Sequence, residues 1–228
     1  MTAPSISSCK PMAKKRVAVL ISGRGSNMAA LIEAAKAPDY PAEIVLVLSN
    51  KPDAGGLDTA RANGIETAVV DHKTFGKDRA AFDRAMQQVL LAHRIDLVCL
   101  AGFMRLLTPE FVGLWSERML NIHPALLPAF KGLDTHRRAI EAHAAIHGAT
   151  VHYVVPEMDA GPVILQGAVA VRNDDSEATL AARVLTVEHR IYPEALRLVA
   201  EGRVTVVDGR CLIDGRPVPD AGTLMPLA

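Results

Sequence analysis

The sequence predicts an α/β protein with a mostly parallel central sheet, helices on both faces, and an antiparallel part towards the C-terminus. Two observations support this class. In the first half, continuous apolar runs such as RVAVLI (16–21) and EIVLVLS (43–49) alternate with segments of helical periodicity, which is typical of parallel strands buried on both faces. In the second half, two alternating segments, 149–155 and 163–171, flank a turn at 156–162, which indicates an antiparallel hairpin.

In the first half, strands and helices are expected to alternate along the chain. The strands are predicted at 16–21, 43–49, 67–70 and 96–100, and the helices at 26–36, 55–63 and 77–93. Residues 1–15 lack periodicity and any apolar segment, so we expect a flexible N-terminal extension rather than a secretory signal. A transit peptide is the less favoured alternative, because this segment contains two prolines and no arginine.

The second half changes character after a short strand at 118–122. A proline-rich loop at 123–132 follows, then a short helix, the hairpin, and a long helix capped by Ser176. A terminal hairpin completes the pattern, and the tail after Pro217 is expected to be irregular. These elements are predicted at 137–143, 149–155, 163–171, 176–201, 204–208 and 211–213. No repeat or linker interrupts the chain, so we expect 16–228 to form a single domain.

Composition excludes several classes of protein. Lys plus Arg and Asp plus Glu each total 25, so no basic excess indicates nucleic acid as a partner. The longest apolar stretches are far shorter than the roughly 20 residues that a bilayer crossing needs. The three cysteines are scattered, which is typical of a reducing compartment and indicates the cytoplasm. Because neither a CxxC nor an HExxH spacing occurs, no metal is expected.

A glycine-containing segment, SGRGSN (22–27), follows the first strand and opens the first helix. Free N–H groups at such a helix start favour an anion. A dinucleotide site would need glycine where Met28 stands, and an acidic residue near the end of the second strand, which here ends LSNK. A Walker A loop is excluded because no Gly-Lys-Ser/Thr follows. A plain tight turn capped by Ser26 is the structural alternative, and the favoured reading is a single phosphate held by Gly25, Ser26 and Asn27.

Two polar positions mark the end of the strand at 118–122. Asn121 and His123 are two residues apart, so their side chains share one face of a strand. Ligands in open α/β sheets bind outside the carboxyl ends of the strands. A satisfied polar strand end is the structural alternative. Asp159 lies in the turn PEMDAGP (156–162), where an aspartate commonly makes only a local turn. Spacing alone leaves the chemistry of these residues open.

The chain resembles the phosphoribosylglycinamide formyltransferases, a family of folate-dependent enzymes of de novo purine (IMP) synthesis. The resemblance is carried by VLISGRGSN, LAGFMRLLTPEFV, LNIHPALLPAFKGLDTHRRAI, HGATVHYVVPEMDAGPVILQ and EHRIYP, which occur in family order from about residue 15 onwards. Asn-x-His with the distant Asp alone would indicate only the wider folate formyltransferase group, which includes methionyl-tRNA formyltransferase and formyltetrahydrofolate hydrolase. The tRNA enzyme carries a C-terminal domain for which this chain has no room, and the hydrolase carries an N-terminal regulatory domain. The SGRGSN loop favours the glycinamide ribonucleotide enzymes.

The resemblance implies a Rossmann-like formyltransferase fold, with phosphate binding in the N-terminal half and folate binding and catalysis in the C-terminal half. The catalytic residues would be Asn121, His123 and Asp159. Glycinamide ribonucleotide would contact Gly25, Ser26, Asn27 and Glu188. The co-substrate 10-formyltetrahydrofolate would contact Arg79, Met104, Arg105, Leu106, Leu107 and Asn121, with residues 155–159 folded over its pterin.

In the mechanism that this resemblance implies, the substrate amine attacks the formyl carbon. Asn121 and a protonated His123 would donate to the oxyanion, and Asp159 would hold His123 charged or relay a proton. No metal is needed. The partners would be two small molecules, without nucleic acid or membrane, and a weak homodimer is left open. A formyltetrahydrofolate hydrolase and a non-catalytic folate- or nucleotide-binding module are the alternatives.

Two positions depart from the family pattern. Ala125 stands where serine is common, and should alter only a turn hydrogen bond. Asp134 stands where histidine is frequent, and would bring negative charge towards the phosphate region.

Overall fold

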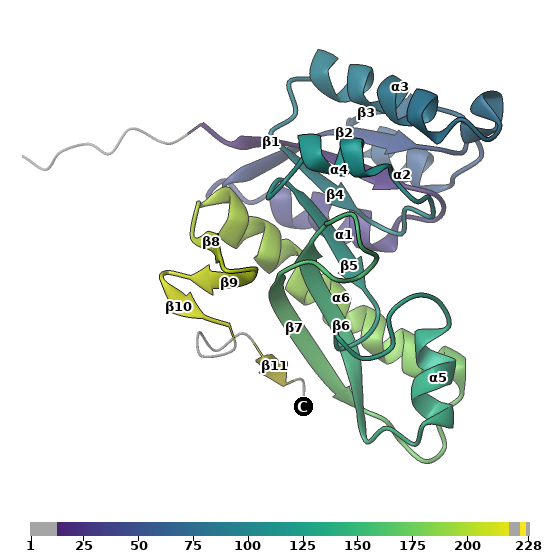
Figure 1. Cartoon of the computed structure of the whole chain (residues 1–228), viewed down its shortest axis with the longest axis vertical. Coiled ribbons are helices and arrows are strands. Elements are labelled where there is room, and N and C mark those ends of the chain that lie inside the picture. The colour runs from purple at the N-terminus through teal and green to yellow at the C-terminus, as the bar shows by residue number, and fades with distance from the viewer. Residues whose placement is uncertain (1–12, 219–223, 227–228) are drawn as a thin grey trace, which may run out of the picture.

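The computed structural model describes residues 13–218 and 224–226, and the elements follow one another as Figure 1 shows. The strands are β1 (Lys15–Ile21), β2 (Ala42–Ser49), β3 (Glu66–Val69), β4 (Leu97–Leu100), β5 (Met119–His123), β6 (Ile146–Tyr153), β7 (Val163–Ala170), β8 (Val204–Val207), β9 (Arg210–Ile213), β10 (Arg216–Pro217) and β11 (Leu224–Pro226). The helices are α1 (Ser26–Ala35), α2 (Gly56–Ala62), the 3-10 turn η1 (His72–Phe75), α3 (Arg79–Ala92), α4 (Pro109–Leu114), α5 (Thr135–Glu141) and α6 (Glu177–Ala200).

The central sheet has eight strands in the order β11-β7-β6-β5-β4-β1-β2-β3. The strands from β3 to β5 are mutually parallel, while β6 runs antiparallel to both β5 and β7. A separate three-stranded antiparallel sheet, β10-β9-β8, follows α6. The predicted fold class, mostly parallel with an antiparallel C-terminal part, is confirmed.

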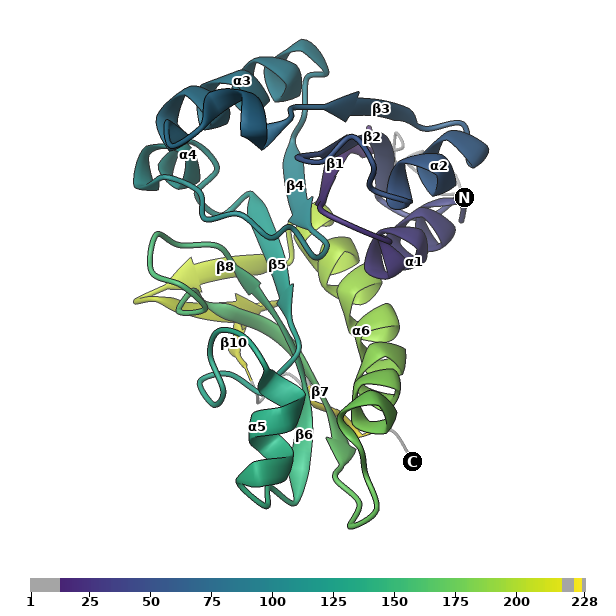
Figure 2. The same cartoon turned by 90° about the vertical axis from the view of Figure 1, so that its right-hand side faces the viewer.

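The helices on the two faces of the sheet pack into two separate apolar cores. One joins buried residues of α1, α2 and α6 to one set of strand side chains, and the other joins α3 and α4 to the opposite set. In Figure 2, α1 and α6 lie along one side of the sheet, and α3 and α4 lie on the other. This arrangement explains the continuous apolar runs of β1 and β4, which must satisfy both cores at once.

The chain order reverses between β1 and β4, which are neighbours in the sheet. Such a reversal opens a crevice at the carboxyl ends of the strands, where ligands bind in open α/β sheets. Tyr192 of α6 is fully buried below this edge, and its hydroxyl lies 3.0 and 3.2 Å from the carbonyl oxygens of Leu100 and Leu120. This side chain therefore ties the last residue of β4 and the second residue of β5 to α6.

Three local expectations need correction or extension. The tail after Pro217 was expected to be irregular, but Leu224–Pro226 forms β11, parallel to β7; without it β7 would be an edge strand with unpaired backbone groups. The sequence also left α4 unassigned, although Thr108 caps it and Pro109 stands at its start. Residues 1–12 of the expected extension at 1–15 lie outside the described residues, and the expectation is wrong for Lys15, which is the first residue of β1.

Within residues 13–218 and 224–226, no helix combines the length and apolar character needed to cross a bilayer.

Candidate active site

The glycine segment forms a sharp link between β1 and α1. Gly25 is the N-cap of α1 and adopts φ 72°, a left-handed conformation that glycine tolerates at low cost. The N-cap is therefore Gly25 and not Ser26, which is the first helical residue. A Cβ at Gly25 would lie 3.1 Å from Met28 Cε. Because glycine offers no capping side chain, the first N–H groups of α1 are left for an outside acceptor.

The two residues expected at the glycinamide ribonucleotide end, Asn27 and Glu188, are brought together although they lie 161 positions apart. Asn27 Nδ2 donates to Glu188 Oε2 over 2.6 Å, and both side chains are buried. Burial raises the pKa of Glu188, and the hydrogen bond from Asn27 opposes this rise. The contact joins the start of α1 to the middle of α6 and supports their assignment to one site.

The expected folate segment, residues 104–107, follows β4 as an extended loop. Its side chains differ in exposure: Met104 and Leu106 are 61% and 62% exposed, whereas Leu107 packs on the core that contains α3 and α4. The backbone N–H of Met104 donates to Ser22 Oγ over 2.7 Å. The apolar surface of the loop is thus presented outwards from a backbone that is tied to the end of β1.

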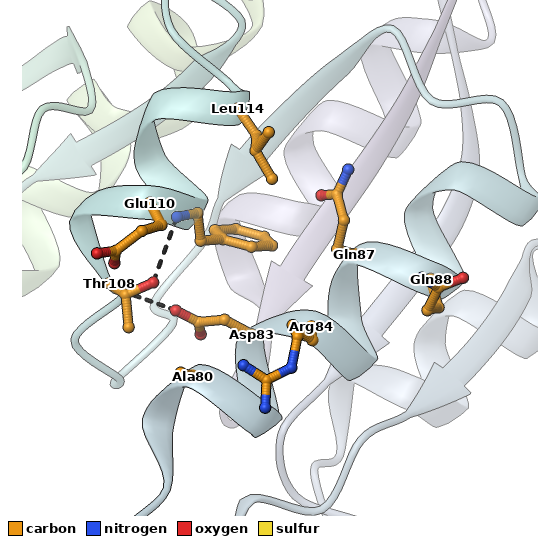
Figure 3. A pocket seen from close by; sticks show the side chains of 9 residues that line it. Ala80, Asp83, Arg84, Gln87, Gln88, Thr108, Glu110 and Leu114 are labelled. Atoms are coloured by element: carbon orange, nitrogen blue, oxygen red, sulfur yellow. Dashed lines mark hydrogen bonds between the residues drawn. The ribbon is translucent and has the colours of Figure 1, made fainter.

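The far end of this loop is tied to α3. Thr108 donates its backbone N–H to Asp83 Oδ2 over 2.7 Å, and its hydroxyl accepts from Phe111 N, as the dashed lines in Figure 3 show. Asp83 is 3% exposed, and burial raises its pKa. A groove of about 270 Å³ between α3 and α4 adjoins this contact. Arg79, expected to contact folate, is exposed in the first turn of α3, one turn before Asp83.

Asn121 and His123 lie on β5 beside two polar residues of β6. The register pairs Asn121 with His152 and His123 with Thr150, so directly opposed side chains share a face. Asn121 Nδ2 lies 3.2 Å from His152 Nε2, and His152 Nδ1 lies 2.8 Å from the carbonyl oxygen of Tyr153. These contacts fit a neutral His152 that donates through Nδ1 and accepts from the Asn121 amide. Burial lowers the pKa of His152, which is consistent with that form.

Asp159 reaches back from its turn to β5 and β6. Its side chain is 10% exposed; Oδ2 lies 3.4 Å from His123 Nδ1 and accepts from Gly132 N over 2.9 Å, while Oδ1 lies 3.9 Å from His152 Nε2. Two of these partners, His123 and Gly132, lie far from Asp159 in the chain, so the alternative of a purely local turn does not describe this carboxylate. The structure thus brings the three expected catalytic residues together around His152.

Both ring nitrogens of His123 face acceptors. Nε2 lies 3.0 Å from the carbonyl oxygen of Phe130, and Nδ1 faces Asp159. The doubly protonated ring would satisfy both acceptors. Donation from His123 to a substrate oxygen would require one of these contacts to be exchanged, so the division of labour expected from the resemblance needs this further step.

Sequence reasoning missed two residues that support the site. His152 orients the Asn121 amide, and Thr150 holds the loop after β5: its Oγ1 donates to Ala125 O over 2.6 Å and accepts from Leu127 N. Their spacing of two along a strand was visible, but its meaning depends on the pairing of β6 with β5. Gln166 of β7 also donates to Thr150 Oγ1.

The two departures from the family pattern have local surroundings. Ala125 is fully buried, and its carbonyl carries the Thr150 hydrogen bond. Asp134 has φ 57° and pairs with Arg137 Nη2 on the surface. The negative charge of Asp134 is therefore matched by a neighbouring cation. Among the described residues, no group of three or more His, Cys, Asp or Glu side chains could hold a metal ion; the expectation that no metal is needed stays a prediction.

Comparison with known proteins agrees with this geometry. The model of the formyl transferase family matches residues 15–196, so the chain belongs to the formyl transferase family. It is 45% identical to phosphoribosylglycinamide formyltransferase of Escherichia coli (strain K12) over 206 residues, which cover 90% of this chain and 97% of that protein. The predicted family resemblance is confirmed.

Other relatives differ in length. The chain is 52% identical over 191 residues to the trifunctional purine biosynthetic protein adenosine-3 of Bos taurus, covering 84% of this chain but only 19% of that protein. The chain thus spans about a fifth of the length of these trifunctional relatives. Among solved structures, phosphoribosylglycinamide formyltransferase from Coxiella burnetii superposes with a TM-score of 0.87 at 40% identity, covering 93% of this chain and all of that one. A formyltetrahydrofolate deformylase from Pseudomonas syringae superposes with a TM-score of 0.83 at 28% identity, covering 89% of this chain and 67% of that one.

Proposed function

We propose that the chain transfers the formyl group of 10-formyltetrahydrofolate to the amine of glycinamide ribonucleotide, giving formylglycinamide ribonucleotide and tetrahydrofolate in purine synthesis. The observation that carries this proposal is the grouping of Asn121, His123 and Asp159 around His152, at the same sheet edge as an uncapped helix start. One subsite suits a phosphate and the other suits chemistry at a carbonyl carbon. The near-full-length similarity to the E. coli enzyme supports the same acceptor.

In the ribonucleotide subsite, the first N–H groups of α1 at Gly25, Ser26 and Asn27 bind the phosphate. Glu188 accepts from the ribose or glycinamide end, while its contact with Asn27 keeps both groups fixed. The folate lies along residues 104–107, where Met104 and Leu106 offer apolar contact, and Arg79 contributes positive charge from α3.

In the transfer step, the amine nitrogen forms a bond to the formyl carbon and the carbonyl oxygen becomes an oxyanion. Asn121 donates an amide N–H to this oxygen, and His123 adds positive charge beside it. The bond from the formyl carbon to N10 of the folate then breaks. The proton released by the amine passes through Asp159, directly or by a water, and returns to the leaving nitrogen.

A direct assay tests this function and separates it from the alternatives. The protein is mixed with glycinamide ribonucleotide and 10-formyltetrahydrofolate, and tetrahydrofolate and formylated product are measured together. We expect both to form in equal amounts. Formate release without the ribonucleotide would identify a hydrolase, and binding of either molecule without turnover would identify a non-catalytic module.

We place this activity in the cytoplasm. Cys99 and Cys211 are free and buried, which fits a reducing compartment. The organisation of 16–228 as one domain and a weak homodimer stay predictions, and sedimentation at increasing protein concentration checks the second.

A further inference from the structure

The loop that follows His123 holds both members of the His123–Asp159 pair through its backbone. The carbonyl oxygen of Phe130 accepts from His123 Nε2 at 3.0 Å, and the N–H of Gly132 donates to Asp159 Oδ2 at 2.9 Å. The first contact holds His123 and the second holds Asp159, the two residues whose Nδ1 and Oδ2 atoms lie 3.4 Å apart. The conformation of residues 130–133 therefore sets the spacing and angle of the pair.

This loop cannot keep its conformation through its own backbone preferences. Phe130 and Asp134 have φ 52° and 57°, and Gly132 has φ 82°. For residues other than glycine, the left-handed region costs roughly 1–2 kcal/mol each. The segment lies outside any helix or strand, so no repeating hydrogen-bond ladder offsets this cost. Contacts from a neighbouring element must select the observed conformation.

Arg138 of α5 supplies those contacts. Its Nη1 donates to the carbonyl oxygens of Lys131 and Leu133, over 2.6 and 3.3 Å, which flank Gly132 on both sides. The guanidinium carbon lies 5.6 Å from the centroid of the Phe130 ring, within the range of a cation–π contact. Among the described residues, no carboxylate lies within salt-bridge distance of Arg138, so its contacts are directed to the loop.

The Phe130 ring has a second contact. His147 of β6 is 1% exposed and meets Phe130 edge to face, with centroids 5.9 Å apart. The ring thus contacts both a guanidinium and a buried imidazole, and the carbonyl oxygen of Phe130 accepts from His123. Displacing the Arg138 guanidinium would release this ring and the two loop carbonyls in one change.

We propose that Arg138 is a positioning residue for formyl transfer, which sets the His123–Asp159 geometry through the backbone of residues 130–133. This inference rests on the proposed function. Arg138 contacts neither the α1 start nor residues 104–107, so its loss should lower kcat and leave both KM values nearly unchanged. Because displacements of about 1 Å can cost 10²-fold in rate, we expect kcat of Arg138→Met to fall by about ten- to a hundredfold.

Arg137 provides a matched control. It is adjacent on the same helix, and its exposed side chain pairs with the carboxylates of Asp134 and Glu141 rather than with the carbonyl oxygens of residues 130–133. Arg137→Met should keep kcat within about twofold, since surface pairs contribute little. Arg138→Lys, which keeps a cation and N–H donors, should recover at least a third of the wild-type kcat; a loss as large as that of the Met variant would overturn the hydrogen-bonding role. Thermal unfolding of every variant reports whether the fold is intact.

A double-mutant cycle with Asp159→Asn gives the decisive comparison. If Arg138 acts through the pair, Arg138→Met should cost almost nothing further once Asp159 is altered. Full multiplication of the two losses, or wild-type kcat in Arg138→Met while Asp159→Asn is inactive, would overturn the positioning role and leave the proposed site intact. Wild-type turnover in Asp159→Asn itself would instead refute the proposed site. Should Arg138→Met fail to fold, the same cycle is run with Arg138→Lys.

Discussion

Acid should destabilise this protein, and one buried histidine, His147, should make a measurable contribution to the loss. His147 is 1% exposed, and burial lowers its pKa from 6.5 to about 4, with smaller contributions from the neighbouring His136 and His123. Between pH 6.5 and 4, His147 is mostly protonated in the unfolded chain and mostly neutral in the folded chain. Stability is therefore complete above about pH 6.5 and is lost as the pH falls towards 4.

The size of this loss follows from the pKa difference. Each pKa unit corresponds to about 1.4 kcal/mol, so His147 accounts for about 3 kcal/mol over the whole window, and for about 2 kcal/mol by pH 5. Urea unfolding followed by circular dichroism at pH 7, 6 and 5 measures it. The variant His147→Leu removes the titrating group and keeps an apolar side chain of similar size against Phe130.

In His147→Leu, the loss of unfolding free energy between pH 7 and 5 should be about 2 kcal/mol smaller than in the wild type. The pKa values of His136, His152 and His189 are also lowered, whereas that of Glu188 is raised. All four groups remain in the variant, but His136 loses its contact with His147, whose Nε2 lies 3.2 Å from His136 Nδ1. The comparison therefore reports His147 together with this contact. An unchanged slope in His147→Leu would refute this reasoning.

Three further outcomes are expected. Asn121→Ala and Asp159→Asn should unfold at wild-type temperatures and lose at least about a hundredfold in kcat. Asn121→Ala removes an oxyanion donor worth about 3 kcal/mol of barrier, and Asp159→Asn removes the carboxylate that transfers the proton; single-turnover rates check both. Asp83→Ala leaves the Thr108 N–H without its acceptor, which costs the bound loop conformation about 1–3 kcal/mol. Because this contact holds the end of the proposed folate segment, residues 104–107, the KM for the folate should rise about tenfold with little change in kcat. Gly25→Ala places a side chain in the left-handed region, and should weaken binding of glycinamide ribonucleotide in calorimetry without changing folate binding.

Much of the fold could be predicted from sequence because strands buried on both faces leave little freedom in residue choice. β1, β2 and β4 begin within one residue of their predicted starts and end where expected. α4 was missed because its six residues are too few to display periodicity, although the Thr108-Pro109 start was a usable signal. β11 was missed because three residues have no distinctive pattern; only the open edge of β7 gives them a partner.

The site was predictable only where it is local in sequence. Asn121 and His123 share a strand face by their spacing, and this is how the structure arranges them. The contact between Gly132 and Asp159 depends on two loops with left-handed residues, a conformation that no periodicity encodes. His152 could be assigned a role only after its strand was paired with β5.

The change of strand direction at β5 explains why these groups can meet at all. β5 is parallel to β4 on one side and antiparallel to β6 on the other. A parallel neighbour would require a crossover connection of a dozen or more residues, and the chain between His123 and Ile146 would then be committed to a covering helix. The antiparallel return instead leaves most of that segment free as the loop that holds His123 and Asp159, and α5 remains short enough to brace it through Arg138. The same reversal sets His152 directly opposite Asn121. The catalytic geometry therefore depends on β6, the strand that runs antiparallel to both of its neighbours, β5 and β7.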